Sequence, residues 1–244
     1  MPADFPFQKI WYGVDLPDIR PIDATYGGEP FAQLPPVDPL HLDGSFRYLS
    51  KQVVQEIDEK VPEYVDKTFK PSGQADIFAP KPKWQKKLAA IQQSLPEHLI
   101  LPEAMVRFMS APEAQNLIPS CTACYFDLPD EALPFRFLGE DGYLFYFYRD
   151  QQDCLFWFYY VRNTGESCIL VSPLPLGVED LGEILKDELV HREVFYTAAS
   201  FEEFIYRTWI ENIIWFDIEE GETTDEQTKA LCEAYLQHYQ QSKS

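Results

Sequence analysis

The feature that most constrains this fold is a run of three apolar segments separated by short, turn-forming connections. Residues 143–148, 154–161 and 167–172 are rich in aromatic and β-branched side chains, which favour β-strands. The last two segments are joined by a tight connection in which Gly165 can adopt a positive φ. The first two are joined across residues 150–153, which are also short and polar. The sequence therefore predicts an antiparallel meander of three strands.

The middle strand of this meander has no polar face. The alternating side chains from Leu155 to Val161 are apolar, and so are those from Cys154 to Tyr160. A strand of this kind is normally covered on both sides. Any part of it left uncovered would expose aromatic rings and form a patch for a partner.

Helical patterns lie on both sides of the meander. Apolar residues at four-residue spacing predict one helix within residues 46–69 and a second over 83–94, whose lysines we interpret as a solvated face. Leu101–Glu103 begins a short helix with proline at its first position. Capping boxes at Ser200–Glu203 and Thr224–Gln227 predict two more helices. The predicted fold class is α+β, with helices packed on a mixed, largely antiparallel sheet that has a central meander.

The first 40 residues contain eight of the chain's 20 prolines. Because proline fixes φ and lacks an N–H donor, we expect no helix and no central strand there. The segment is nevertheless rich in apolar residues such as Trp11 and Phe31, which favours an extended arm laid over the main body, with a disordered tail as the alternative. Residues 1–94 are thus predicted to form an arm with accessory helices, and residues 95–244 an α+β domain.

The charge is strongly negative and unevenly distributed. The net charge of the 244 residues is −20, and residues 95–244 alone carry nine lysines and arginines against 27 aspartates and glutamates, a net of −18. Such a surface repels nucleic acid and anionic lipid but accelerates encounter with a basic protein. The simpler interpretation, that the charge only maintains solubility, remains open.

The sequence also bears on the cellular compartment. Charged residues from Asp4 onward interrupt every apolar stretch near Met1, so no signal peptide is predicted. The most apolar run, Cys154 to Val161, is too short to span a bilayer as a helix. Five cysteines without an export signal indicate reduced thiols, and we therefore expect a cytoplasmic protein.

Motifs for catalysis or metal binding are scarce. The pair Cys121 and Cys124 has the spacing of half a zinc site or of a redox pair, but no second C-x-x-C and no paired histidines complete it. We interpret the two residues as small thiols near the start of a strand. The four histidines are far apart in sequence. We therefore predict no catalytic residue, no metal and no cofactor.

Three stretches in the order expected of one family carry a resemblance. They are a Leu-Pro-Glu helix start at Leu101 followed by Phe108, a sheet start from Ile118 to Leu128, and strands followed by the S-F-x-x-F helix of Ser200–Phe204. Over residues 95–216 this arrangement resembles the SUKH superfamily, which includes fungal cell-wall-synthesis regulators and bacterial toxin-immunity proteins. Residues 1–94 have no counterpart in it.

The resemblance implies a non-enzymatic domain that acts by binding another protein. The partner would be a toxin domain in the immunity branch, where a basic enzyme would suit the negative charge, or another protein in the regulatory, adaptor-like branch. Exposed rings of the sheet, with acids at their rim, are the candidate contact surface. The candidate residues are Tyr146, Tyr148, Trp157 and Tyr159, with Asp141, Asp150 and Asp153 at the rim.

Two other functions remain open at this point. One is a thiol- or zinc-dependent enzyme that uses Cys121 and Cys124. The other is a structural protein whose proline-rich arm pairs with a second copy of the chain. The sequence does not determine the oligomeric state.

Overall fold

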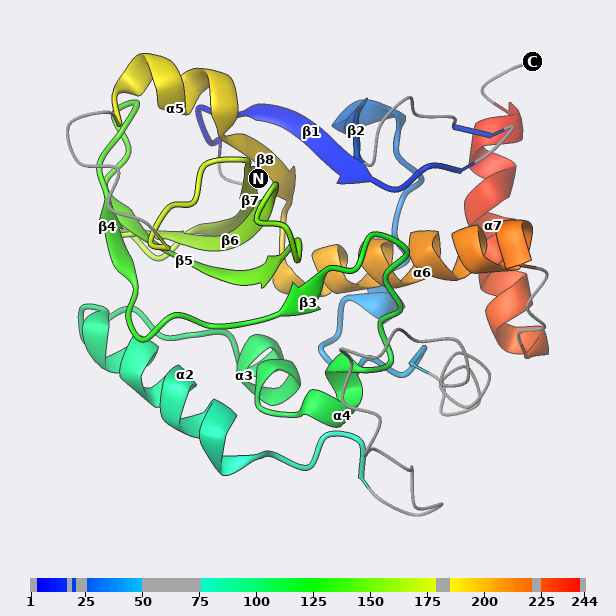
Figure 1. The fold of residues 1–244 in the computed structure, drawn as a ribbon, viewed down its shortest axis with the longest axis horizontal. Helices are drawn as coiled ribbons and strands as arrows, with labels where there is room; N and C mark the ends of the chain where they lie inside the picture. The colour runs from blue at the N-terminus through cyan, green and yellow to red at the C-terminus, as the bar shows by residue number, and fades with distance from the viewer. Residues whose placement is uncertain are drawn as a thin grey trace.

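The computed structural model describes residues 4–16, 19–20, 26–49, 76–178, 185–220 and 225–241. The helix predicted within residues 46–69 lies outside these ranges beyond Leu49, and residues 46–49 form a turn in which the Leu49 N–H donates to the Phe46 carbonyl (3.1 Å). The described residues form one mixed, largely antiparallel sheet with helices packed around it, which is an α+β fold (Figure 1).

Eight strands make up the sheet in the described residues. Their spatial order is β2-β1-β8-β7-β6-β5-β3, and β4 also pairs with β5. The strands are β1 (Gln8–Gly13), β2 (Gly27–Pro30), β3 (Tyr125–Phe126), β4 (Leu133–Phe135), β5 (Gly142–Arg149), β6 (Phe156–Arg162), β7 (Ser167–Ser172) and β8 (Phe195–Ala198).

The predicted meander is confirmed. Strands β5, β6 and β7 are consecutive, adjacent and antiparallel, with a register irregularity in β5 between Tyr146 and Tyr148. Gly165 in the β6–β7 turn has a φ of +96°, the left-handed conformation that the turn requires. The strand at Tyr125 is also present, and it pairs with the end of β5.

The prediction that the first 40 residues contain no inner strand is wrong. Strand β1 lies inside the sheet, parallel to β8 through Gln8 and Lys9 and antiparallel to β2 through residues 10–13. The prolines lie on either side of β1 and none lies within it. Every residue of the strand therefore keeps the N–H group that donates to the neighbouring strands. The sheet therefore contains strands from both sides of residue 94.

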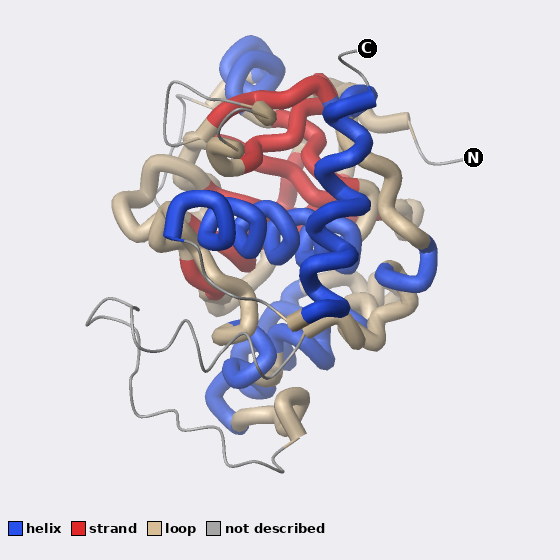
Figure 2. The backbone as a smooth tube through the Cα atoms, turned by 90° about the vertical axis from the view of Figure 1, so that its right-hand side faces the viewer, coloured by secondary structure: helices blue, strands red, loops and turns tan. Residues whose placement is uncertain are grey.

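The helices are distributed unequally over the sheet. Figure 1 shows α2, α3 and α4 on one side of the strands together with α6, whereas α5 lies on the other side. Figure 2 shows α7 across α6, in front of the strands. The α-helices are α2 (Pro82–Ser94), α3 (Glu103–Met109), α4 (Pro112–Gln115), α5 (Asp187–Glu193), α6 (Phe201–Glu220) and α7 (Glu226–Gln241), and two 3₁₀ turns, η1 (Phe31–Gln33) and η2 (Pro39–His41), lie in the N-terminal segment.

Helix ends agree with the predicted capping residues in one case and differ in another. The Ser200 hydroxyl accepts a hydrogen bond from the Glu203 N–H (3.1 Å), so α6 begins where its capping box predicts. Helix α7 is capped by Asp225, whose carboxylate accepts from the Thr228 N–H (3.1 Å) and from the Thr228 hydroxyl (2.7 Å). Thr224, the residue predicted to cap α7, lies outside the described residues.

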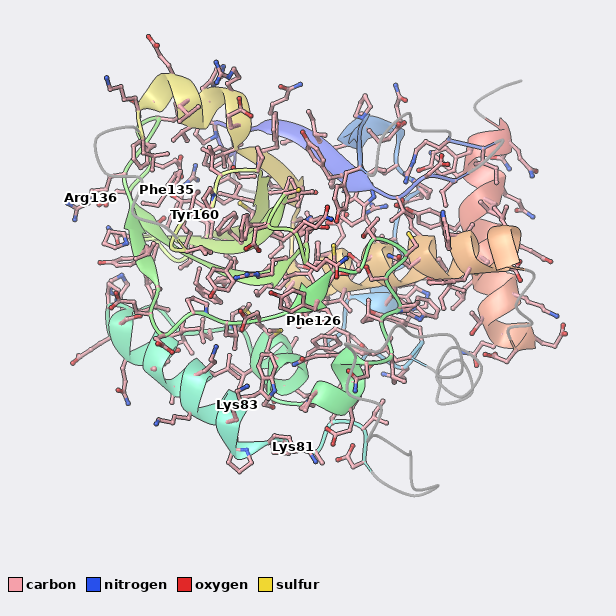
Figure 3. The ribbon with its side chains drawn as sticks, viewed as in Figure 1. Lys81, Lys83, Phe126, Phe135, Arg136 and Tyr160 are labelled. Atoms are coloured by element: carbon pink, nitrogen blue, oxygen red, sulfur yellow. The ribbon has the colours of Figure 1, made fainter. Side chains whose placement is uncertain are left out.

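Each face of the meander packs against its own core, as the all-apolar middle strand predicts. Trp157 and Tyr159 of β6 lie in the core on the side of α2, α3 and α6, which we call the helical face. Phe158 and Tyr160 lie in the core on the opposite face. Figure 3 shows the ring of Phe126 between β3 and the helices, and those of Phe135 and Tyr160 together on the other side, with centroids 5.4 Å apart. The sheet is therefore covered on both sides.

Candidate functional site

The four aromatic rings chosen from the sequence are all buried. Tyr148, Trp157 and Tyr159 belong to the core of the helical face, and Tyr146 belongs to the core of the opposite face. Their exposed fractions lie between 3% and 8%. The expected surface of exposed rings is therefore not formed by these residues, because helices cover one face of the sheet, and α5 together with Phe5, Phe7 and Leu176 covers the other.

The three acids chosen as a rim do not lie together. Asp141 precedes β5, is exposed, and pairs with Arg136 (3.3 Å). Asp150 and Asp153 lie at the other end of β5, in its turn to β6. Asp153 is exposed and pairs with Arg149 (2.8 Å). Only the last two acids therefore belong to a common region.

Asp150 is buried and acts as a structural acceptor within this turn. Its Oδ1 accepts from the N–H of Gln152 (2.7 Å), and its Oδ2 accepts from the hydroxyl of Tyr26 (2.7 Å). Tyr26 belongs to the N-terminal segment, just before β2, and the sequence alone does not indicate this contact. Asp150 therefore fixes the turn and fastens the N-terminal segment to it.

Two exposed residues, Tyr125 and Asp153, and two half-buried ones, Asp127 and Arg149, gather around the same end of β5. We define the hairpin-end surface as Tyr125, Asp127, Arg149 and Asp153. Tyr125 lies on the short edge strand β3 and is 41% exposed, which is unusual for a large ring in this chain. The Arg149 guanidinium carbon lies 5.5 Å from the centre of the Tyr125 ring, and Arg149 also pairs with Asp127 (3.8 Å). The positive charge of Arg149 therefore contacts the Tyr125 ring and the carboxylates of Asp127 and Asp153 at one end of the hairpin.

The cysteine pair does not have the surroundings of a reactive site. Burial raises the pKa of Cys121 to about 12, and burial likewise raises the pKa of Cys124. A nucleophilic or metal-binding cysteine requires the opposite shift, because the thiolate is the reactive form. In the part of the chain that the structure describes, no group of three or more histidine, cysteine, aspartate or glutamate side chains is placed to hold a metal ion.

Cys124 instead takes part in a hydrogen-bond chain. Its sulfur lies 2.9 Å from the hydroxyl of Tyr26, which donates to Asp150. The thiol is therefore the donor to the tyrosine oxygen. Burial strongly raises the pKa of Tyr26, so the hydroxyl keeps its proton. The chain of thiol, phenol and carboxylate therefore holds three segments together.

A buried ion pair lies next to this chain. Arg20 and Glu211 are both almost fully buried, and Arg20 Nη2 donates to Glu211 Oε2 (2.7 Å). The same carboxylate accepts from Trp11 Nε1 (2.9 Å) and from the Tyr235 hydroxyl (2.8 Å). Glu211 is therefore saturated with donors from the N-terminal segment and from α7. The feature of the sequence that could have indicated this pair is Glu211, a single acid within the apolar run of α6.

Gly13 permits this arrangement. A β-carbon at this position would lie 2.3 Å from both Arg20 Nη2 and Glu211 Oε2, and 2.6 Å from Trp11 Nε1. No side chain fits into that space, because the ion pair occupies it. The glycine is thus required by close approach, and the buried pair and the end of β1 form one unit.

Most of the basic residues in the acidic region are already engaged. Eight of the nine lysines and arginines in residues 95–244 lie in the described part of the chain, and six of these eight form ion pairs with acids of the same chain. These six are Arg136, Arg149, Arg162, Arg192, Arg207 and Lys229. Since the acids outnumber the bases threefold, a large surplus of carboxylates remains.

The lysines of α2 form the basic patch of the N-terminal half. Lys81 and Lys83 lie at the beginning of this helix (Figure 3), and Lys83 and Lys86 are exposed. Lys81 pairs with Glu113 (2.6 Å) and Lys87 pairs with Asp127 (3.3 Å). The predicted solvated helix face is therefore present at Lys83 and Lys86, whereas Lys81 and Lys87 form ion pairs.

Two further observations bear on relationships and on membranes. No helix among the described residues combines the length and the apolar character that crossing a bilayer demands.

Comparison of the chain with protein-family models, with curated proteins and with solved structures finds no match.

Proposed function

We propose that this chain is a non-enzymatic, cytoplasmic protein-interaction module of SUKH type that binds a basic protein partner through the hairpin-end surface. The observation that carries the proposal is the exposed ring of Tyr125, which lies next to the Arg149 guanidinium, while the same guanidinium pairs with Asp127 and Asp153. Tyrosine and arginine are the residue types that dominate binding energy at protein interfaces. The proposed site is therefore centred on the edge strand β3, next to the meander whose rings are buried.

The charge of the chain supports a basic partner. The surplus of carboxylates in residues 95–244 produces a negative field that extends over roughly a Debye length, about 8 Å at physiological ionic strength. This field attracts a basic protein and repels nucleic acid and anionic lipid. Direct binding of nucleic acid or of a membrane surface is therefore not part of the proposal.

The short edge strands support side-chain recognition over strand addition. Strand β3 has two residues, β4 has three, and β2, at the other edge of the sheet, ends at Pro30. Short edges and a proline oppose pairing with a further strand. The partner would therefore contact side chains such as Tyr125 and would not extend the sheet.

The test is capture of a partner by the full chain immobilised on a resin, from the cells in which the protein is made. We expect a basic protein to be retained at low salt and to be released as salt rises, because screening weakens the attraction. Tyr125→Ala and Asp153→Asn should each reduce retention at least fivefold. Asn tolerates the positive φ of +58° at position 153, so this variant alters charge and leaves the turn unstrained.

The matched control is Glu188→Gln, which removes an exposed acid of α5, outside the hairpin-end surface. It should retain the partner at close to the wild-type level. Retention of no protein, or of a protein that binds all three variants equally, would contradict the proposed surface.

The captured protein also separates the two branches of the proposal. An immunity protein should block the activity of a basic toxin domain at a 1:1 ratio. An adaptor should leave the activity of its partner unchanged while remaining bound to it.

A further inference from the structure

One side of helix α2 is exposed along its length. Figure 1 shows the helix at the outer edge of the helical face, and its buried residues, Leu88 and Ile91, lie on its other side. The exposed positions recur at spacings of three and four residues, and the same line continues into the loop that follows the helix. We define the α2 stripe as these exposed residues: Lys83, Lys86, Ala89, Gln93, Glu97 and Ile100.

The charges of the α2 stripe are separated by sign. Helix α2 contains lysines but no acid, and the stripe begins with Lys83 and Lys86. The ion pairs of the described residues engage Lys81 and Lys87, but neither of the two stripe lysines. After the helix has ended, the stripe continues with the acid Glu97. One end of the stripe is therefore positive and the other end is negative.

The positive end lies where a helix least favours it. The partial positive charge at the N-terminus of a helix stabilises acids in the first turn and opposes lysines there. Lys83 nevertheless lies in the first turn of α2, which contains no acid, in a chain with 40 acids and 20 lysines and arginines. Departures from such local preferences are expected at functional positions, where a contact outside the element compensates for them.

The negative end carries an apolar side chain that projects into solvent. Ile100 is 72% exposed, whereas its neighbours Leu99 and Leu101 are buried. The Gln92 side chain fixes the backbone on both sides of it, because the amide donates to the Leu99 carbonyl (2.8 Å) and accepts from the Leu101 N–H (2.9 Å). A partner that covers Ile100 therefore meets a loop that is already ordered, which lowers the entropy lost on binding.

We propose that the α2 stripe binds the α2 stripe of a second copy of this chain, with the two helices antiparallel about a two-fold axis. Such an axis brings the positive end of each stripe to the negative end of the other, so the same attraction occurs twice in one dimer. Ala89 lies near the middle of the stripe, and its short side chain lets the two helices approach closely.

The spacing along the stripe fits this arrangement. With the axis at the level of Ile91, each residue lies opposite the residue that is equally far from Ile91 in the other direction. Glu97 then lies opposite residues 83–86 of the second copy, which carry the stripe lysines. Ile100 lies opposite Pro82, which is exposed at the beginning of the helix. Charged and apolar groups are therefore matched in one register.

The charge and the size of the contact indicate how stable the dimer should be. Residues 1–94, which include α2, carry 11 lysines and arginines against 13 aspartates and glutamates, a net of −2, so repulsion between copies is weakest on this part of the chain. A contact made by one helix and its adjoining loop lies at the small end of specific interfaces. We therefore expect a weak dimer, and its formation does not depend on the proposed function of the hairpin-end surface.

The test is sedimentation equilibrium of the full chain at increasing protein concentration and physiological ionic strength, at which the net repulsion is screened. We expect the mass to rise from that of a monomer toward that of a dimer. Lys86→Glu and Glu97→Lys should each raise the dissociation constant about tenfold or more, because each places like charges opposite each other at both symmetric contacts. The matched control is Lys186→Glu, a charge reversal at an exposed position before α5, which should dimerise like the wild type.

A mixture of the two stripe variants separates this arrangement from a general effect of charge. In a mixed dimer, the new acid of Lys86→Glu lies opposite the new lysine of Glu97→Lys, and the two unchanged residues also attract each other. The mixture should therefore dimerise at close to the wild-type level. Equal dissociation constants for the mixture and for the single variants would overturn the proposed arrangement.

A second pair of variants tests the apolar contact. Ile100→Ser should weaken the dimer, whereas Leu40→Ser, which alters an equally exposed residue on η2, should not. A monomer at every concentration would overturn the proposal, and the stripe would then be a solvated face or a site for a different acidic protein. Stripe variants that dimerise like the wild type would overturn it as well.

Discussion

The two faces of the sheet are covered by different means. On the helical face, the buried ion pairs Arg20–Glu211 and Arg207–Glu203 lie among the apolar side chains, and Arg207 also donates to the Pro35 carbonyl (2.9 Å). On the opposite face the core consists of rings and mostly aliphatic side chains, and its ion-paired arginines lie at its border: Arg162 pairs with Glu140 and is a fifth exposed, and Arg149 lies over the rings of Tyr146 and Phe156.

This difference separates two ways of holding a segment in place. The start of the N-terminal segment lies on the opposite face through Phe5 and Phe7, which pack on the Tyr160 ring. The side chains of Trp11, Val14 and Leu16 belong instead to the core of the helical face, where Trp11 and Arg20 are held by hydrogen bonds and charge. Apolar packing tolerates a range of shapes, whereas a buried charge demands one specific partner. The helical face should therefore be the less tolerant of single changes.

The largest expected effect comes from neutralising one partner of the buried pair. Glu211→Gln preserves shape but leaves the Arg20 charge uncompensated, and we expect a loss of about 3–5 kcal/mol in the free energy of unfolding, measured by urea titration. The double variant Arg20→Met with Glu211→Gln should recover part of this loss. Asp141→Asn, in an exposed pair, should change stability by less than about 0.5 kcal/mol. If Glu211→Gln and Asp141→Asn lowered the free energy of unfolding by the same amount, the contrast between buried and exposed ion pairs would be contradicted.

A somewhat smaller effect is expected from a cavity on the apolar side. Leu170 is fully buried in the core of the opposite face, and Leu170→Ala should cost about 2–5 kcal/mol by the same measurement. Ile169→Ala, one residue earlier on β7 and on the helical face, is its matched counterpart. Similar costs would show equal packing on both sides, and a loss below about 1 kcal/mol for Leu170→Ala would show that the opposite face is loosely filled.

The last effect is absent at neutral pH, develops only under alkaline conditions, and concerns the partly buried thiol of Cys121 on the helical face. The pKa of Cys121 is raised by burial from 9.0 to about 12, so between these values the unfolded thiol loses its proton while the folded one retains it. Stability should therefore be unaffected below pH 9 and fall as pH rises toward 12. Cys121→Ser should make this fall shallower, whereas Cys154→Ser, at an exposed site, should keep the wild-type slope. Identical slopes for all three proteins would show that the thiol of Cys121 is not protected.

The parts of the fold that local pattern encodes could be predicted from the sequence. The three strands of the meander, α2 and α6 follow from side-chain alternation, helical spacing and a capping serine, and all are present. Strand β1 could not be predicted in this way, because its place is set by pairing with β8 near the other end of the chain. The prediction was based on the number of prolines in the first 40 residues and therefore overlooked the proline-free stretch from Gln8 to Gly13.

The candidate site shows the same limit. Alternation along β6 correctly indicated two covered faces, and that inference already implied that Trp157 and Tyr159 are buried. Tyr125 was recognised only as the start of a strand, since its exposure depends on the short edge strand to which it belongs. The contacts of Tyr26 and Arg20 join residues far apart in sequence, and no local spacing could reveal them.

The position of β1 also governs how the chain must acquire its structure during synthesis. Strand β1 pairs on one side with β2, which follows closely in sequence, and on the other side with β8, so its β8 edge stays unpaired until residues 195–198 have been synthesised. Joining β1 and β2 to the rest of the sheet therefore depends on β8, and a chain truncated before β8 would leave this edge of β1 without its partner strand.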